Sequence, residues 1–185
     1  MSTTDVSIQF TDYTFESAPA GSRRHLEQTA AHLGYLPIAL GRMAESPELL
    51  SGFLTASGLF ERSSLDPVAR EVLIMTIAVR NDCHLCVAMH TAKLTGLSAS
   101  PSMIAALRAG EIVTDDRLAA LQIFTLAVLA ARGAASPADL RRFLTAGYTR
   151  QNALDVVLGI GAYTISTFAN RLTSAPVDDA LAPFA

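Results

Sequence analysis

The sequence predicts an all-α protein, and three observations support that prediction. No stretch of the 185 residues keeps the period-two alternation of apolar and polar residues that marks a half-buried strand. Most of the chain instead divides into segments with helix start and stop signals, often a capping residue at the front and a glycine at the end. Half of the residues are hydrophobic, so the chain can bury a substantial helical core.

The expected helices follow one another with short connections. The first opens on Ser22 as an N-cap and closes on Gly34. Two later ones begin with a capping residue followed by proline, at Ser46 and at Asp66. The expected ranges are 22–34, 36–45, 46–63, 66–81, 82–96, 100–110, 114–133, 136–147 and 149–172.

Three parts of the chain are expected. Residues 1–21 lack periodicity and are predicted to form an extended N-terminal arm. Residues 22–173 form the helical domain, and residues 174–185 form a C-terminal tail. The length suits a single domain.

Charge and hydropathy exclude some classes of partner. The net charge is −3 and the isoelectric point is near 5.7, with no cluster of Lys or Arg, so no nucleic-acid partner is expected. Only 17% of the residues are charged and the mean hydropathy is +0.33, which is high for a soluble monomer. The excess indicates either thorough burial of helices or an apolar interface between subunits.

The chain is expected to be cytoplasmic and free of the membrane. Its longest apolar stretch, residues 118–131, is shorter than the roughly 18–20 residues that cross a bilayer. The polar, acidic start of the sequence lacks the order of a signal peptide. In a reducing compartment, a lone pair of cysteines is more often catalytic or metal-binding than a structural disulfide.

The two cysteines of the chain lie in the expected helix 82–96. Cys83, Cys86 and His90 stand at i, i+3 and i+7, within about 60° of one another around the helix. Asn81 or Asp82 is the expected N-cap, which places Cys83 in the first turn, where the helix dipole lowers a thiol pKa. His90 follows Cys86 by four residues and is expected to accept its proton, directly or through a water.

Glu71 is the expected third member of this group. If residues 66–80 and 82–95 form an antiparallel hairpin that turns near Asn81, Glu71 and His90 lie at equal distances from the turn. Glu71 also interrupts an otherwise apolar run, and a buried carboxylate is costly without a partner. The sequence therefore predicts a Glu71–His90–Cys86 relay.

This relay suits peroxide chemistry. A base beside Cys86 raises its thiolate fraction, and a thiolate can attack the O–O bond of a hydroperoxide to give a sulfenic acid. Cys83, one turn earlier, can then condense with Cys86 to a disulfide, which an external dithiol resets by exchange.

The combined pattern Glu71-x11-Cys83-x2-Cys86-x3-His90 resembles the alkylhydroperoxidase AhpD family, within the carboxymuconolactone decarboxylase-like superfamily. The tight resemblance covers about residues 66–96, and a looser one extends from 33 to 172. It implies an AhpD-like helical bundle in which an antiparallel helix pair carries the CxxC motif.

The resemblance also implies an activity and an assembly. It implies a thiol-dependent peroxidase with Cys86 as the peroxidatic thiol, Cys83 as its resolving partner, and Glu71 and His90 as the proton relay. It further implies a homo-oligomer, a trimer or a hexamer, with a hydroperoxide substrate, an external dithiol reductant and no cofactor. The chain departs from the family at Leu85, where the best-studied members carry a second relay histidine.

Other interpretations of these residues stay open at this stage. The cysteines are consistent with a reduced, buried pair, with a redox sensor or thiol-exchange protein that is not a peroxidase, or with a zinc-stabilised helical module that uses all four residues as ligands. His84 is expected at the surface or at the mouth of a pocket. Asn170 and Arg171 are expected to line the pocket or an interface, or to serve a structural role.

Overall fold

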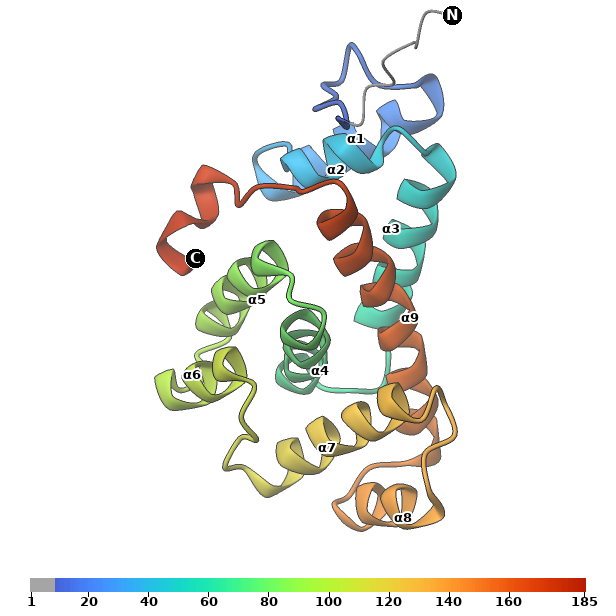
Figure 1. Ribbon diagram of the computed structural model, residues 1–185, viewed down its shortest axis with the longest axis vertical. Coiled ribbons are helices and arrows are strands. Elements are labelled where there is room, and N and C mark those ends of the chain that lie inside the picture. Colours follow the sequence, from blue (N-terminus) through green and yellow to red (C-terminus); the bar gives the residue numbers. More distant parts are fainter. Residues whose placement is uncertain (1–8) are drawn as a thin grey trace, which may run out of the picture.

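The computed structural model describes residues 9–185, and all regular structure in that range is helical (Figure 1). The all-α prediction is therefore confirmed. Residues 1–8 of the predicted N-terminal arm lie outside the described range. The elements are α1 (Ala20–Leu33), α2 (Ile38–Met43), α3 (Pro47–Glu61), α4 (Pro67–Arg80), α5 (His84–Gly96), α6 (Pro101–Ala109), α7 (Asp116–Ala130), α8 (Pro137–Thr145), α9 (Arg150–Leu172) and a final 3-10 helix, η1 (Asp179–Phe184).

Helix α4 lies at the centre of the bundle and contacts α5, α6, α7 and α9 (Figure 1). Every residue from Glu71 to Ala78 is buried, because neighbours surround this helix on all sides. Helix α9 runs along α3, and the approach is close where Gly159 faces α3 and α4. A Cβ atom on Gly159 would lie 2.6 Å from Cε2 of Phe60, so only glycine fits there.

The first helix begins earlier than its sequence predicts. Helix α1 starts at Ala20, directly after Pro19, and not at an N-cap on Ser22. Ser22 is buried inside the helix, and its hydroxyl donates to the carbonyl oxygen of Ala44, with an O···O distance of 2.8 Å. The Ser22 hydroxyl therefore makes a tertiary hydrogen bond and does not cap the helix.

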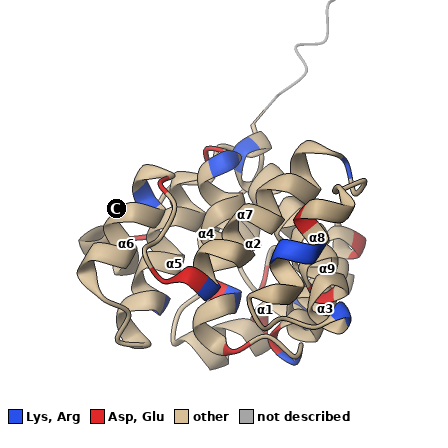
Figure 2. Ribbon diagram, turned by 90° about the horizontal axis from the view of Figure 1, so that it is seen from below, with Lys and Arg blue, Asp and Glu red and all other residues tan. Residues whose placement is uncertain are grey.

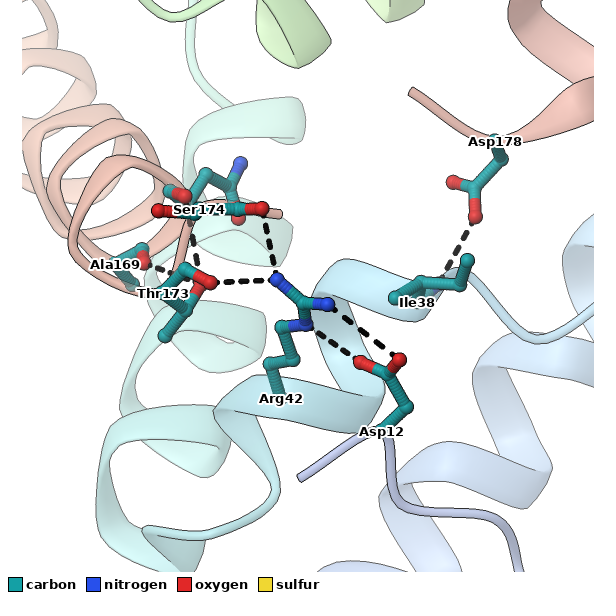
Figure 3. A network of polar contacts seen from close by, with 8 residues as sticks. Asp12, Ile38, Arg42, Ala169, Thr173, Ser174 and Asp178 are labelled. Carbon is teal, nitrogen blue, oxygen red and sulfur yellow. Dashed lines mark hydrogen bonds and ion pairs between the residues drawn. The ribbon is translucent and has the colours of Figure 1, made fainter. Parts of the chain in front are cut away.

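The segment after α9 is fastened to the rest of the bundle. The Arg42 guanidinium donates to the carbonyl oxygens of Thr173 and Ser174, at 2.6 and 2.8 Å (Figure 3). The carboxylate of Asp178 accepts the backbone N–H of Ile38 at 3.0 Å. The predicted tail thus contains η1, which contacts α5 and covers one side of the cysteine pair.

The charges on the molecule are mixed. Lys and Arg alternate with Asp and Glu over the side seen in Figure 2. Helix α9 is the one helix among the described residues that is long and apolar enough to cross a membrane, judged by length and composition alone. Its inner side packs against α3 and α4, as a core helix of a bundle does. Its outer side exposes large apolar residues, namely Leu154, Val157, Phe168 and Leu172.

Candidate active site at the turn between α4 and α5

The turn between α4 and α5 places the cysteines. Asp82 has φ of +54°, in the left-handed region that Asp and Asn adopt more readily than most residues. The backbone N–H of Cys83 then donates to the carbonyl oxygen of Ala78 at 2.9 Å, which closes the end of α4. Arg171 on α9 donates to both the backbone carbonyl and the carboxylate of Asp82. The turn is therefore held by its own backbone hydrogen bond and by Arg171 of α9.

The helix boundary differs from the sequence prediction at this turn. Asn81 is the C-cap of α4, and Cys83 itself is the N-cap of α5, which starts at His84. The prediction that Asn81 or Asp82 caps α5 was wrong, because the left-handed backbone of Asp82 ends one helix and cannot open the next. Cys83 has the extended backbone of an N-cap, with φ −98° and ψ 91°. Its sulfur consequently lies at the end of the helix rather than in the first turn.

Glu71 and His90 meet across the helix pair, as their equal distances from the turn predict. Nδ1 of His90 lies 2.6 Å from Oε2 of Glu71, and the two residues are 3% and 7% exposed. Burial disfavours the carboxylate, but the charge and hydrogen bond of His90 outweigh burial and hold the pKa of Glu71 below its ordinary value of 4.5. Nζ of Lys93, 3.8 Å from the other carboxylate oxygen, acts in the same direction.

The two sulfurs lie next to each other. Their separation is 2.7 Å, and both cysteines are free and buried. Nδ2 of Asn170 on α9 donates to Sγ of Cys86 at 3.3 Å and, more weakly, to Sγ of Cys83 at 3.9 Å. The hydroxyl of Ser166, one turn earlier on α9, is 4.0 Å from Sγ of Cys86. Helix α9 thus supplies polar groups that can stabilise negative charge on sulfur.

The surroundings of the pair favour a single thiolate, mainly on Cys83. The hydrogen bond between the two thiols is the largest influence and lowers the pKa of Cys83 from 9.0 to about 7, with smaller help from the Cys86 backbone N–H, Asn170 and Arg171. The same bond, burial and the nearby charge raise the pKa of Cys86. Near pH 7 the dithiol therefore loses the first of its two protons, mainly from Cys83, and the second proton is then shared between the two sulfurs.

Cys86 and His90 open into one cavity of about 390 Å³, here called the front cavity. Its walls come from α1, α2, α3, α5 and α9, and they are mainly apolar. The ring of Tyr163 stands edge-on to that of His90, with centroids 5.4 Å apart, and burial raises the pKa of Tyr163 to about 12. The apolar lining includes Leu40, Met43, Phe53, Leu54, Leu85 and Met89.

The structure does not bring all four predicted site residues into direct contact. Glu71 contacts His90, and Cys83 contacts Cys86, but within residues 9–185 no hydrogen bond joins His90 to either sulfur. The two pairs share the front cavity through His90 and Cys86. Over the same residues, no three His, Cys, Asp or Glu side chains gather closely enough to hold a metal ion, so the zinc interpretation gains no support from the geometry.

Several site residues were not predicted from the sequence. Ser166 and Lys93 carry no motif, and only the packing of α9 and α5 brings them to the site. His25 and His32 line the front cavity from α1. Asn170, for which the sequence left a pocket role and a structural role open, is bonded to the sulfurs.

Leu85, the residue before Cys86, stands where the AhpD pattern has a second relay histidine, and no other histidine in the described part of the chain takes that place. Leu85 is 3% exposed and forms part of the front cavity wall. The side chain of His84 is 87% exposed and lies 3.8 Å from the carboxylate of Asp82. Among residues 9–185, His90 is therefore the one buried histidine that shares the front cavity with Cys86.

Comparisons with known proteins agree with the fold. The profile of the carboxymuconolactone decarboxylase family matches residues 47–125, which include α3, α4 and α5 and reach into α7. No curated protein matches the chain. A crystal structure of an AhpD-core, peroxidase-related protein from Ralstonia eutropha JMP134 superposes with a TM-score of 0.82 at 18% identity, over 94% of this chain and 93% of that one.

Two further crystal structures share the architecture. A peroxidase-related protein from Silicibacter sp. TM1040 has a TM-score of 0.78 at 19% identity, over 97% of this chain and 96% of that one. The debrominase Bmp8, solved as a cysteine-to-alanine variant with 2,3,4-tribromopyrrole, has a TM-score of 0.73 at 13% identity, over 99% of this chain and 97% of that one. At these identities the likenesses establish the fold.

Proposed function

Since the chain is AhpD-like and its residues 47–125 match the carboxymuconolactone decarboxylase family, we propose that it is a thiol-dependent peroxidase that reduces hydroperoxides with the Cys83–Cys86 dithiol. One observation carries the proposal. A buried cysteine, in contact with a second thiol at 2.7 Å, opens into the same apolar cavity as a histidine that a carboxylate holds at 2.6 Å. This is the arrangement that a nucleophilic thiol and a proton donor need.

The first step oxidises Cys86. The shared proton moves onto Cys83, which leaves a thiolate on Cys86 facing the front cavity. The Cys86 sulfur attacks the terminal oxygen of the hydroperoxide, the O–O bond breaks, and Cys86 becomes a sulfenic acid. His90 donates a proton to the departing alkoxide, which leaves as an alcohol. Glu71 holds the His90 ring in place for this step, through the 2.6 Å contact between Oε2 and Nδ1.

The second step closes the disulfide. The Cys83 sulfur attacks Cys86, the sulfenic oxygen leaves, and it departs as water with the proton from Cys83. Together the two steps turn one dithiol and one hydroperoxide into one disulfide, one alcohol and one water. Because the sulfurs are already in contact, resolution needs no large movement of the chain.

The decisive experiment is a stoichiometric oxidation. One equivalent of cumene hydroperoxide should remove both titratable thiols and form one intramolecular disulfide, detected as a loss of 2 Da by intact mass spectrometry, since two hydrogens leave. Cys86→Ser should abolish the reaction, and Cys83→Ser should accumulate a sulfenic acid on Cys86 that dimedone traps. If peroxide leaves both thiols titratable in the native protein, the proposal fails.

Turnover distinguishes the peroxidase from the alternatives. Catalytic consumption of hydroperoxide with dihydrolipoamide, thioredoxin or glutathione supports the peroxidase and identifies its reductant. Disulfide formation without turnover, together with an oligomeric state that depends on oxidation, would indicate a redox sensor. The debrominase fold neighbour adds one control substrate, a brominated pyrrole, since replacing bromine by hydrogen also consumes the two electrons of a dithiol.

A further inference from the structure

The two sulfurs of the dithiol open into different cavities. Cys86 lines the front cavity and Cys83 does not. Cys83 lines a separate cavity of about 300 Å³, here called the rear cavity, and Cys86 does not. The turn at Asp82, the end of α9 and the segment from Ser174 to Val177 form its walls.

A thin wall separates the two cavities. Leu85 and Asn170 line both, and they are 3% and 6% exposed. The hydrogen bonds from Nδ2 of Asn170 to the sulfurs of Cys83 and Cys86 hold this wall against the dithiol. A disulfide formed between the cysteines would therefore present one sulfur to each side.

The two sides suit different solutes. The front cavity has mainly apolar walls, in keeping with the organic part of a hydroperoxide. The rear cavity has a mixed lining, in which charged and polar side chains stand beside Leu85, Ala175 and Val177. The side chains of Asp82 and His84 at its border are 68% and 87% exposed. The Arg171 side chain, 46% exposed, adds a guanidinium at the same border. A polar solute can approach Cys83 there without crossing the apolar pocket.

We propose that the thiol which regenerates the enzyme enters the rear cavity and attacks the sulfur of Cys83, while the hydroperoxide reaches Cys86 from the front. This inference rests on the proposed function for the oxidising half of the cycle. Thiol–disulfide exchange requires the attacking sulfur to approach the attacked sulfur from the side opposite the leaving sulfur. Because Cys83 lines the rear cavity and Cys86 does not, a thiolate in that cavity would reach Cys83 first.

The exchange balances as two displacements. The incoming thiolate forms a bond to Sγ of Cys83, and the Cys83–Cys86 bond breaks, so that Cys86 leaves as a thiolate. A second thiol attacks the incoming sulfur, gives the oxidised disulfide of the reductant, and frees Cys83. Two thiols supply the two electrons that restore the dithiol.

The surroundings of Cys86 are suited to the leaving thiolate. The pKa of Cys86 in the dithiol is raised by its bond to Cys83, by burial and by the Cys83 charge, in that order, and of these only burial persists once Cys83 carries the reductant. The hydrogen bonds from Asn170 and Ser166 remain, and they favour the thiolate form. The departing sulfur also faces the front cavity, where the next hydroperoxide arrives.

The first experiment locates the attack without any substitution. The disulfide is formed with diamide, treated with excess glutathione, quenched in acid and alkylated with N-ethylmaleimide. Fragmentation of the peptide 81–93 should place glutathione on Cys83 and the maleimide on Cys86. Glutathione on Cys86 would overturn the proposal.

The second experiment fills each cavity in turn. Ala175 lines the rear cavity, and Ala175→Leu should slow reduction of the diamide-formed disulfide by dihydrolipoamide or glutathione at least tenfold more than it slows oxidation by cumene hydroperoxide. Gly58 lines the front cavity and has room for a Cβ, so Gly58→Leu should show the opposite bias. Ala180→Leu, on the exposed part of the same C-terminal segment, is the matched control and should change neither rate.

These experiments test the entrance of the thiol separately from the proposed peroxidase function. Equal effects of Ala175→Leu on both half-reactions would refute a separate entrance for the thiol. Diamide forms the disulfide without peroxide. If the protein does not react with hydroperoxides, the proposed function is therefore refuted, but the entrance of the thiol can still be tested. If only thioredoxin, and neither small thiol, is slowed by Ala175→Leu, the rear cavity does not admit free thiols and the proposal is overturned.

Discussion

The shared proton of the dithiol makes a quantitative prediction for Cys86→Ala. The hydrogen bond between the Cys83 and Cys86 thiols is the largest influence that lowers the pKa of Cys83 from 9.0 to about 7. Alanine has no thiol, so this bond is lost in the variant and the pKa of Cys83 should return most of the way to 9.0. At pH 7 the thiolate fraction of Cys83 should fall from about a half to about 1%, a loss of about 50-fold, because each pKa unit changes the ratio tenfold.

Alkylation kinetics measure this change directly. Iodoacetamide reacts with the thiolate, so its rate at Cys83, followed by mass spectrometry of the peptide 81–93 from pH 5 to 10, gives the pKa. Cys86→Ser keeps a hydroxyl donor at the same position and is the matched control. Its Cys83 pKa should lie between the other two values.

One result would refute the reasoning. If Cys83 in Cys86→Ala still titrates at about 7, the thiolate does not depend on its partner sulfur. The helix end and Arg171 would then be sufficient by themselves, and the dithiol would not share a proton.

Further predictions concern the relay, the core and the surface. Glu71→Gln should slow oxidation by hydroperoxide by about 10²–10³-fold, because the carboxylate that pairs with His90 is lost. The same change should remove a loss of stability as pH falls below 4.5, since a carboxylate with a lowered pKa stabilises the fold only while it is ionised. Urea unfolding from pH 3 to 7 measures this effect. Gly159→Ala should reduce the free energy of unfolding by about 1–3 kcal/mol through overpacking, whereas Gly161→Ala, with open space around its Cβ, should raise it by about 0.5–1 kcal/mol. We also propose that the exposed apolar side of α9 joins subunits: Phe168→Glu should lower the mass in light scattering with little change in stability, and a native chain that is monomeric at all concentrations would contradict the proposed homo-oligomer.

Much of the fold follows from local rules that the sequence displays. Ser46, Asp66 and Ser100 each precede a proline, and each side chain caps the helix that follows, because N-cap geometry depends on a few adjacent residues. The contact between Glu71 and His90 also follows from local geometry. The rise per residue of an α-helix is fixed, so the position of the turn between two antiparallel helices decides which of their residues lie opposite each other. The sequence prediction was wrong where tertiary contacts override local preference, at Ser22 and at the cap of α5.

The chain by itself therefore determined the helices, the facing acid and imidazole, and the closeness of two sulfurs three residues apart. Only the tertiary structure decided what surrounds those sulfurs. Asn170 and Ser166 reach the sulfurs because α9, about 80 residues further along the chain, packs against α3 and α4, and Arg42 holds the C-terminal segment beside them. Such contacts are set by how whole helices pack, which no local pattern encodes. They also open the two sulfurs to two different cavities.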